Sequence, residues 1–116
     1  MTEKEALRQL ADTIRESDEY KYFQQCKNDA FENETTAALL REYGRLQTKL
    51  QMFALTGKQA DEEEMTRFQQ MSGLLFAMPD ASAYLLSQMQ MQKKLADLFA
   101  FLCSEAGVPV DVPQLS

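Results

Sequence analysis

The chain has 116 residues, enough for one domain, and 45% of them are hydrophobic, which is enough for a core. Because only 4 glycines and 3 prolines interrupt it, the composition favours a few long helices over many short strands. A net charge of −6 and a pI of about 4.6 argue against direct nucleic-acid binding, which requires a basic face.

The first third of the sequence predicts two helices. Thr2 and Glu5 have the spacing of a capping box at the start of a helix over residues 3–16. Its expected apolar face consists of Ala6, Leu7, Leu10, Ala11 and Ile14. Ser17 or Asp18 caps a second helix, roughly residues 18–31. The apolar positions of that helix are rich in aromatic residues: Tyr20, Tyr22, Phe23, Cys26, Ala30 and Phe31.

The third predicted helix is the clearest. After a break at Asn33 and Glu34 it runs from Thr35 or Thr36 to about Thr56, with Gly57 as its C-cap. Apolar residues recur at alternating spacings of four and three, at Leu39, Tyr43, Leu46, Leu50 and Phe53. That spacing is typical of the seam of a coiled coil or helix bundle.

A short connection, residues 57–60, predicts that a fourth helix returns antiparallel to the third. Asp61 is its expected N-cap, and we expect it to carry apolar residues as far as Met78 and to end at Pro79. The three glutamates at positions 62–64 suit the positive end of the helix dipole. One helical turn supplies too few converging oxygens for a hard-cation site.

Asp80 or Ser82 is the expected N-cap of a fifth helix, which continues to about Glu105, before Gly107. Between Leu95 and Cys103 its apolar residues nearly encircle the helix, so it is buried centrally or shared with a second chain. We therefore expect an all-α fold of about five helices, an antiparallel bundle with a long central helical hairpin that oligomerises through its helices. Residues 1–106 form the expected single domain, and residues 107–116 an extended tail rich in proline and valine.

The residue types predict no enzyme. The chain has no histidine, the commonest general base and metal ligand, and no Gly-rich phosphate loop, GxSxG or HExxH motif. We assign no catalytic, cofactor-binding or metal-binding residues and no cofactor. With no signal sequence and no long apolar stretch, the protein is expected to be cytoplasmic and not inserted in a membrane.

The two cysteines, Cys26 and Cys103, leave two interpretations open. Each lies on an apolar helix face, where a thiol packs as a small hydrophobe. The alternative is a thiol-based redox or iron–sulfur sensor. A cluster normally takes four ligands, which requires thiols from more than one chain.

The helical pattern predicts an interaction module, a homo-oligomer (dimer or tetramer) that binds partner proteins. Aromatic and aliphatic anchors dominate such interfaces. The candidates for this role, which are equally candidates for the core of a single chain, are Leu46, Leu50, Phe53, Leu95, Phe99 and Leu102.

The order of these elements resembles the YlbF/YmcA family of small helical bacterial proteins over about residues 3–105. The resemblance begins with Ala6-Leu7-x-x-Leu10-Ala11-x-x-Ile14-x-x-Ser17-x-Glu19-Tyr20 and Tyr20-x-x-Phe23. A long helix rich in Leu and Gln, a Gly57-Lys58 turn, an acidic helix start and a final helix from Tyr84-Leu85 to Leu102 follow.

The resemblance implies a cytoplasmic regulator of Gram-positive bacteria that self-associates or pairs with sister family proteins. It implies an influence on competence, sporulation and biofilm formation, through a complex linked to messenger-RNA processing by ribonuclease Y. Members of that complex hold iron–sulfur clusters through cysteines near the C-terminus. Residues 108–116 contain no cysteine, so we assign no cluster ligands.

Overall fold

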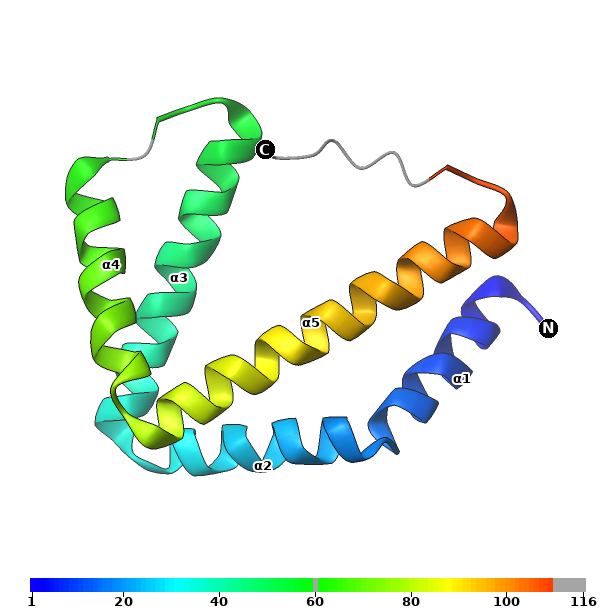
Figure 1. Ribbon diagram of the computed structural model, residues 1–116, viewed down its shortest axis with the longest axis horizontal. Coiled ribbons are helices and arrows are strands. Elements are labelled where there is room, and N and C mark those ends of the chain that lie inside the picture. Colours follow the sequence, from blue (N-terminus) through cyan, green and yellow to red (C-terminus); the bar gives the residue numbers. More distant parts are fainter. Residues whose placement is uncertain (60, 110–116) are drawn as a thin grey trace.

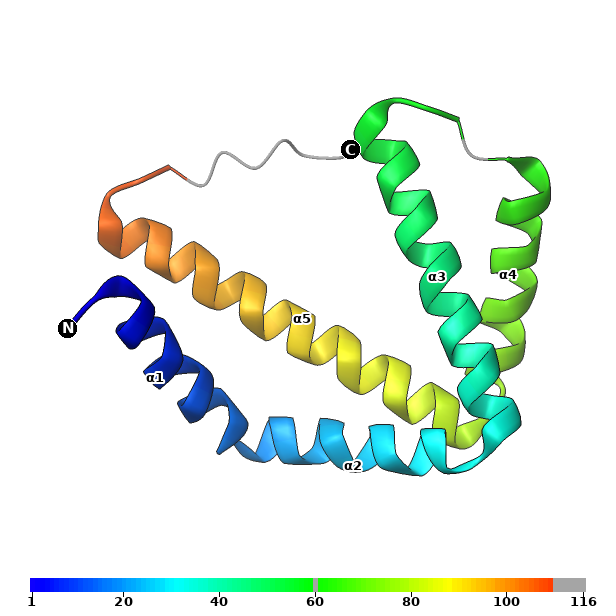
Figure 2. The same cartoon turned by 180° about the vertical axis from the view of Figure 1, so that it is seen from behind.

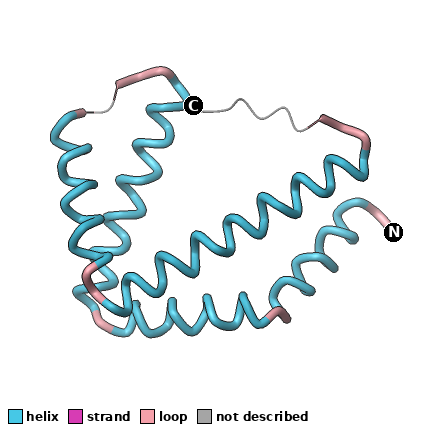
Figure 3. Tube along the Cα trace, in the orientation of Figure 1, coloured by secondary structure: helices cyan, strands magenta, loops and turns pink. Residues whose placement is uncertain are grey.

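A computed structural model describes residues 1–59 and 61–109 of the chain. Within these residues it contains five helices and no strand, joined by short connections (Figure 1, Figure 3). The helices are α1 (Glu3–Arg15), α2 (Asp18–Glu32), α3 (Glu34–Thr56), α4 (Glu62–Phe76) and α5 (Pro79–Ala106). The predicted all-α fold is confirmed. Most of the expected tail, residues 110–116, lies outside the described residues.

The five helices form an open, flat V (Figure 1, and from behind in Figure 2). One arm is the antiparallel hairpin of α3 and α4, as predicted. In the other arm α2 lies beside the first part of α5, and α1 continues outward from α2. The arms meet where α2 leads into α3 and α4 leads into α5. The Cα trace measures 46 × 36 × 19 Å, so the molecule is little more than one helix pair thick.

Side-chain caps begin four of the five helices. The amide of Glu5 donates to Thr2 Oγ1 (3.1 Å) and the amide of Thr2 donates to Glu5 Oε2 (3.3 Å), which confirms the capping box. Ser17, Asn33 and Asp61 each accept a backbone amide hydrogen bond as N-caps of α2, α3 and α4. Helix α3 therefore begins at Glu34, one or two residues earlier than predicted, because the Asn33 side chain satisfies a free amide at the helix start.

The prediction that Pro79 ends α4 is wrong. Pro79 is instead the first residue of α5. Helix α4 ends at Phe76, and Met78 is the N-cap residue of α5, without a side-chain cap hydrogen bond. Proline suits the first position of a helix because its fixed φ is helical and the amide hydrogen it lacks would have no partner there. The tight connection between Phe76 and Pro79 brings the start of α5 against the hairpin.

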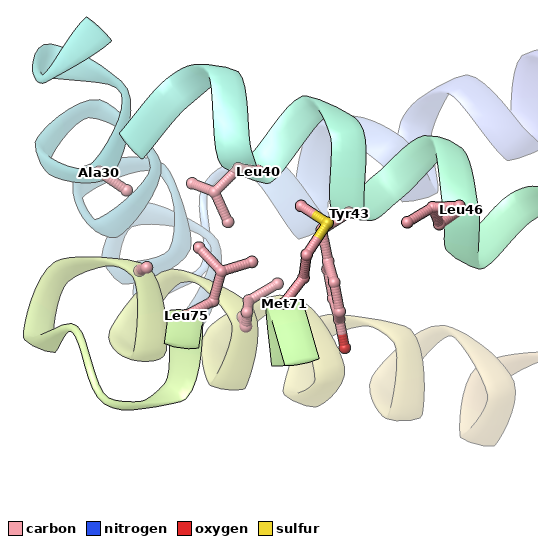
Figure 4. Packing of buried hydrophobic residues seen from close by; sticks show 8 residues of the cluster. Ala30, Leu40, Tyr43, Leu46, Met71 and Leu75 are labelled. Atoms are coloured by element: carbon pink, nitrogen blue, oxygen red, sulfur yellow. The ribbon is translucent and has the colours of Figure 1, made fainter. Parts of the chain in front are cut away.

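The core lies at the junction of the two arms, where α2, α3, α4 and α5 converge (Figure 4). Tyr43 of α3 stacks on Phe68 of α4, with ring centroids 4.7 Å apart and an interplanar angle of 6°. Of the larger side chains, Leu46 and Leu75 are buried most completely. The cluster of buried residues consists of Ala30, Leu40, Tyr43, Leu46, Met71, Leu75, Ala81 and Leu85.

Aromatic packing joins α2 to α5. The ring of Tyr84 lies between Phe23, stacked with centroids 5.8 Å apart, and Phe31, in edge contact at 5.4 Å. Burial raises the pKa of the Tyr84 hydroxyl because desolvation disfavours the charged phenolate. Further along, the ammonium of Lys94 on α5 lies 3.4 Å from a carboxylate oxygen of Glu19 on α2. These contacts hold α2 against the first half of α5.

Ion pairs add to the packing of the α3–α4 hairpin. Lys49 Nζ lies 2.6 Å from Glu64 Oε1, and Arg67 Nη2 lies 3.2 Å from Glu42 Oε1. A hydrogen bond from Arg45, more than any other effect, lowers the pKa of the Glu42 carboxyl. Because these groups are partly or fully exposed, water screens them and they contribute little to stability.

Gly57 has a backbone conformation that other residues adopt with strain. It ends α3 with φ of 75° and ψ of 8°, and its amide donates to the carbonyl of Phe53. We expect Gly57→Ala to lower the free energy of unfolding by about 1 kcal/mol, because a Cβ disfavours the left-handed region. Urea denaturation followed by circular dichroism measures this change.

Gly73 provides the matched control for Gly57. It lies inside α4, and a Cβ there would meet no atom within 4 Å. Gly73→Ala is therefore expected to stabilise the protein by about 0.5–1 kcal/mol through its higher helix propensity. If both substitutions shifted stability in the same direction, the left-handed cap at Gly57 would be contradicted.

Candidate interaction surface

Helix α1 is amphipathic, but only Ala11 and Ile14 of its apolar face are half-buried, and the rest of that face is exposed. None of its 13 residues is buried, and Leu7 and Leu10 are 55% and 39% exposed. The expected apolar face of α1 therefore contributes no residue to the core cluster. The physical reason is position: α1 extends beyond the junction where the other four helices converge (Figure 1).

One apolar stripe of α5 begins in the core and ends in solvent. Residues along it recur at alternating spacings of four and three, which keeps them on one side of a helix. Its first two members, Ala81 and Leu85, are buried in the core cluster. Its later members Leu95, Phe99 and Leu102 are 50%, 53% and 52% exposed. The whole stripe consists of Ala81, Leu85, Gln88, Gln92, Leu95, Phe99, Leu102 and Ala106, so two glutamines separate its buried apolar residues from its exposed ones.

We call the exposed residues of the α1 apolar face and of the α5 stripe, taken together, the distal apolar surface. Figures 1 and 2 show α1 beside the last turns of α5, where the other arm has diverged. The sequence identified the α5 residues as candidates but not those of α1, whose stripe has the same spacing as a buried face. The surface is defined by Leu7, Leu10, Leu95, Phe99 and Leu102.

The three candidate anchors on α3 lie elsewhere. Leu46 is 1% exposed and belongs to the core of the single chain. Leu50 and Phe53 are half-buried, and the Lys49 ammonium lies 5.8 Å from the centroid of the Phe53 ring. Met52, which the sequence did not single out, is 54% exposed on the same helix. The structure does not bring the α3 and α5 candidates together into one cluster.

The charges that flank the distal apolar surface are balanced. Helix α1 carries three basic residues, Lys4, Arg8 and Arg15, and three acidic ones, Glu3, Glu5 and Asp12. Over residues 93–106, α5 carries two of each sign: Lys93, Lys94, Asp97 and Glu105. The chain as a whole has a net charge of −6. The surface is therefore nearly neutral on a molecule that is otherwise acidic.

The cysteines do not form a site. Cys26 of α2 and Cys103 of α5 are free thiols, and both are buried. In the described ranges no group of three or more His, Cys, Asp or Glu side chains is arranged to hold a metal ion. The observed burial fits the packing interpretation, and nothing supports the alternative of a redox or iron–sulfur sensor.

Two further features bear on function. A shallow groove runs between α2 and α5, lined by charged and apolar side chains that include Glu19, Lys94 and Phe101. It is open and lacks converging groups of the kind that orient a small substrate. Across the described part of the chain, none of the helices combines the length and apolarity needed to cross a lipid bilayer.

Comparison with known proteins identifies relatives across most of the chain. A UPF0342 protein of Caldicellulosiruptor saccharolyticus is 28% identical over 90 residues, which are 78% of this chain and 75% of that protein. A UPF0342 protein of Symbiobacterium thermophilum is 27% identical over 104 residues, which are 90% of this chain and 91% of that protein.

A solved structure shares the fold. The protein of unknown function (DUF964) from Bacillus stearothermophilus superposes with a TM-score of 0.76, at 17% sequence identity, over 90% of this chain and 91% of that one. A family model described as "Control of competence regulator ComK, YlbF/YmcA" matches residues 4–102. The chain therefore belongs to the YlbF/YmcA family.

Proposed function

We propose that this protein is a non-enzymatic helical adaptor, which self-associates and binds other proteins in the cytoplasm to regulate gene expression. The observation that carries the proposal is the exposed distal apolar surface on a chain of this regulatory family. Exposed, contiguous apolar side chains on a small protein mark interaction sites. The description of the family model names control of the competence regulator ComK.

The absence of histidine from the sequence favours an adaptor over an enzyme. With no histidine in the chain, the usual pairs of nucleophile and base are missing. The carboxylates of Asp61 to Glu64 are accounted for as a helix N-cap and first turn. An adaptor needs only shape, apolar anchors and a stable scaffold, and the helices provide all three.

The finer proposal follows from the family resemblance. We propose that the partners are sister family proteins and an RNA-processing complex built on ribonuclease Y, with effects on competence, sporulation or biofilm formation. The acidic balance of the chain favours contact with the proteins of such a complex rather than with its RNA.

The test is an affinity pull-down of the tagged protein from the cytoplasm of its own host, treated with RNase and analysed by mass spectrometry. We expect sister family proteins or ribonuclease Y to be recovered above a tag-only control and to survive RNase, because the contacts are between proteins. Recovery of the protein alone would contradict the partner-binding part of the proposal. Loss of the partners after RNase would instead indicate a bridge of RNA.

A further inference from the structure

We infer that residues 110–116, here called the tail segment, fold back along α5 and cover Leu95, Phe99 and Leu102 of the same chain. The tail segment lies outside the described residues. This inference rests on the partner binding proposed above and adds its regulation, because a partner must displace the tail segment to reach these side chains. Its support comes from the direction in which the chain leaves α5, and from the length and the apolar pattern of the tail segment.

The chain changes direction at the end of α5. Gly107 has φ of 73° and ψ of 25°, the left-handed conformation that commonly ends a helix. The amide of Gly107 donates to the carbonyl of Ser104 (3.3 Å), and the amide of Val108 donates to the carbonyl of Cys103 (2.9 Å). These two bonds define a Schellman motif. Residues 107–109 leave α5 on the side where the V opens, away from α1, and turn back along the helix (Figure 1).

The same motif directs the chain toward the exposed stripe of α5. In a Schellman motif, the second residue past the helix commonly contacts an apolar side chain near the helix end. Here these residues are Val108 and Leu102, which are 57% and 52% exposed. Phe99 and Leu95 precede Leu102 in the stripe at spacings of three and four. A chain that continues back from Val108 over Leu102 therefore meets the rest of the exposed stripe.

The tail segment is long enough to reach this stripe. An extended chain advances about 3.3 Å per residue, so Val110 and Val112 can lie about 10 Å and about 17 Å from Gly107. A helix advances about 1.5 Å per residue, so Phe99 and Leu95 lie about 12 Å and about 18 Å from Gly107, measured back along α5. Each valine can therefore reach the level of one apolar side chain of the stripe.

The sequence of the tail segment suits a cover for an apolar stripe. Alternate residues of an extended chain point to the same side, which groups Val110 with Val112. Asp111 would then point to the opposite side, where its carboxylate stays in water. Pro109 and Pro113 favour an extended chain over further helix, because proline lacks an amide hydrogen and disfavours helical geometry in the residue before it.

A segment of the same chain has an advantage over a separate molecule as the occupant. Its connection to α5 holds it near the stripe at an effective concentration on the order of millimolar. A short apolar segment that binds weakly therefore stays bound while no partner is present. A partner with a larger interface binds more tightly and displaces it. The tail segment thus shields Leu95, Phe99 and Leu102 from water and from weak, non-specific contacts.

The first experiment is disulfide mapping on the full chain that carries Val112→Cys together with Leu95→Cys. Mild oxidation is expected to join the two positions within one chain, because a disulfide requires Cα atoms no more than about 7 Å apart. In the control, Met52→Cys replaces Leu95→Cys, since Met52 is similarly exposed (54% against 50%) but lies on α3. We expect the Leu95 pair to form at least about ten times faster than the Met52 pair. Peptide masses distinguish these bonds from bonds to the native, buried Cys26 and Cys103.

Electrophoresis without reducing agent shows whether the bond lies within one chain, because a bond between chains doubles the mass of 13.3 kDa. No bond within the chain, or equal rates for the two pairs, overturns the inference. Circular dichroism checks that the variants keep their helices. If the first pair loses helix content, Val110→Cys with Phe99→Cys repeats the test nearer to Gly107.

The second experiment tests competition between the tail segment and a partner. Val112→Asp places a charge in the inferred contact and is expected to raise partner recovery in the pull-down by at least about threefold, because more chains then have a free surface. Gln59→Asp adds the same charge in the exposed connection between α3 and α4 and is expected to leave recovery unchanged. Equal recovery from both variants overturns the regulation. An intrachain disulfide without any recovered partner supports the cover and contradicts only the proposed function.

Discussion

Leu75→Ala is expected to lower the free energy of unfolding by about 3 kcal/mol, within the 2–5 kcal/mol range of leucine-to-alanine changes in cores. Leu75 is 0% exposed and lies in the cluster where α2, α3, α4 and α5 converge (Figure 4). The loss combines two terms: the transfer free energy that the removed atoms contributed by being buried, and the cost of the cavity that they leave. In a protein whose total stability is typically 5–15 kcal/mol, this change is large.

Leu74 offers a control one residue away. It carries the same side chain in the same helix but is 52% exposed, so Leu74→Ala should change stability by no more than about 0.5 kcal/mol. Urea denaturation measures both variants at one fixed protein concentration, because the proposed self-association would make apparent stability depend on concentration. Equal effects of the two substitutions would contradict the convergence of four helices on Leu75.

Ala81→Leu is expected to destabilise the protein by about 1–3 kcal/mol through overpacking. Ala81 lies near the start of α5, is 0% exposed and shares the core cluster with Ala30 of α2. Small residues at both positions leave no room for a larger side chain where the helices converge. A leucine there must displace a neighbour or shift α5, and a fall in the thermal unfolding midpoint reports the cost.

Ala100→Leu is the matched control for Ala81→Leu. Ala100 belongs to the same helix but is exposed, so leucine there meets no packed neighbour within the chain. We expect its effect on stability to lie within about 0.5 kcal/mol. An Ala81→Leu variant as stable as Ala100→Leu would show that α5 does not enter the core at Ala81.

Much of the secondary structure was predictable because its signals are local. The Thr2–Glu5 capping box, the Asp61 N-cap and the left-handed Gly57 depend on residues within a few positions of one another. The α3–α4 hairpin was expected because a short connection, residues 57–60, favours antiparallel neighbours. Pro79 was misassigned because proline both follows helices and begins them, and only the packing of Met78 and Ala81 at the junction distinguishes the two cases.

The candidate surface was only partly predictable. The nearly all-apolar face of α5 indicated that something covers Leu95, Phe99 and Leu102, and the structure shows that nothing within the described part of the chain buries them. The stripe of α1 has the same spacing as a buried face, so the sequence could not separate Leu7 from a core residue. Conversely, Leu46 has the spacing of an interface anchor but is buried by its own chain.

The sequence by itself determined that the chain is all-helical and where each helix carries its apolar stripe. The tertiary structure decided which parts of those stripes are buried. The physical reason is that a helix is specified by neighbours three and four residues away, whereas burial depends on whether another helix comes within packing distance. Divergence of the arms leaves Ala81 covered and Phe99 exposed on one continuous stripe of α5.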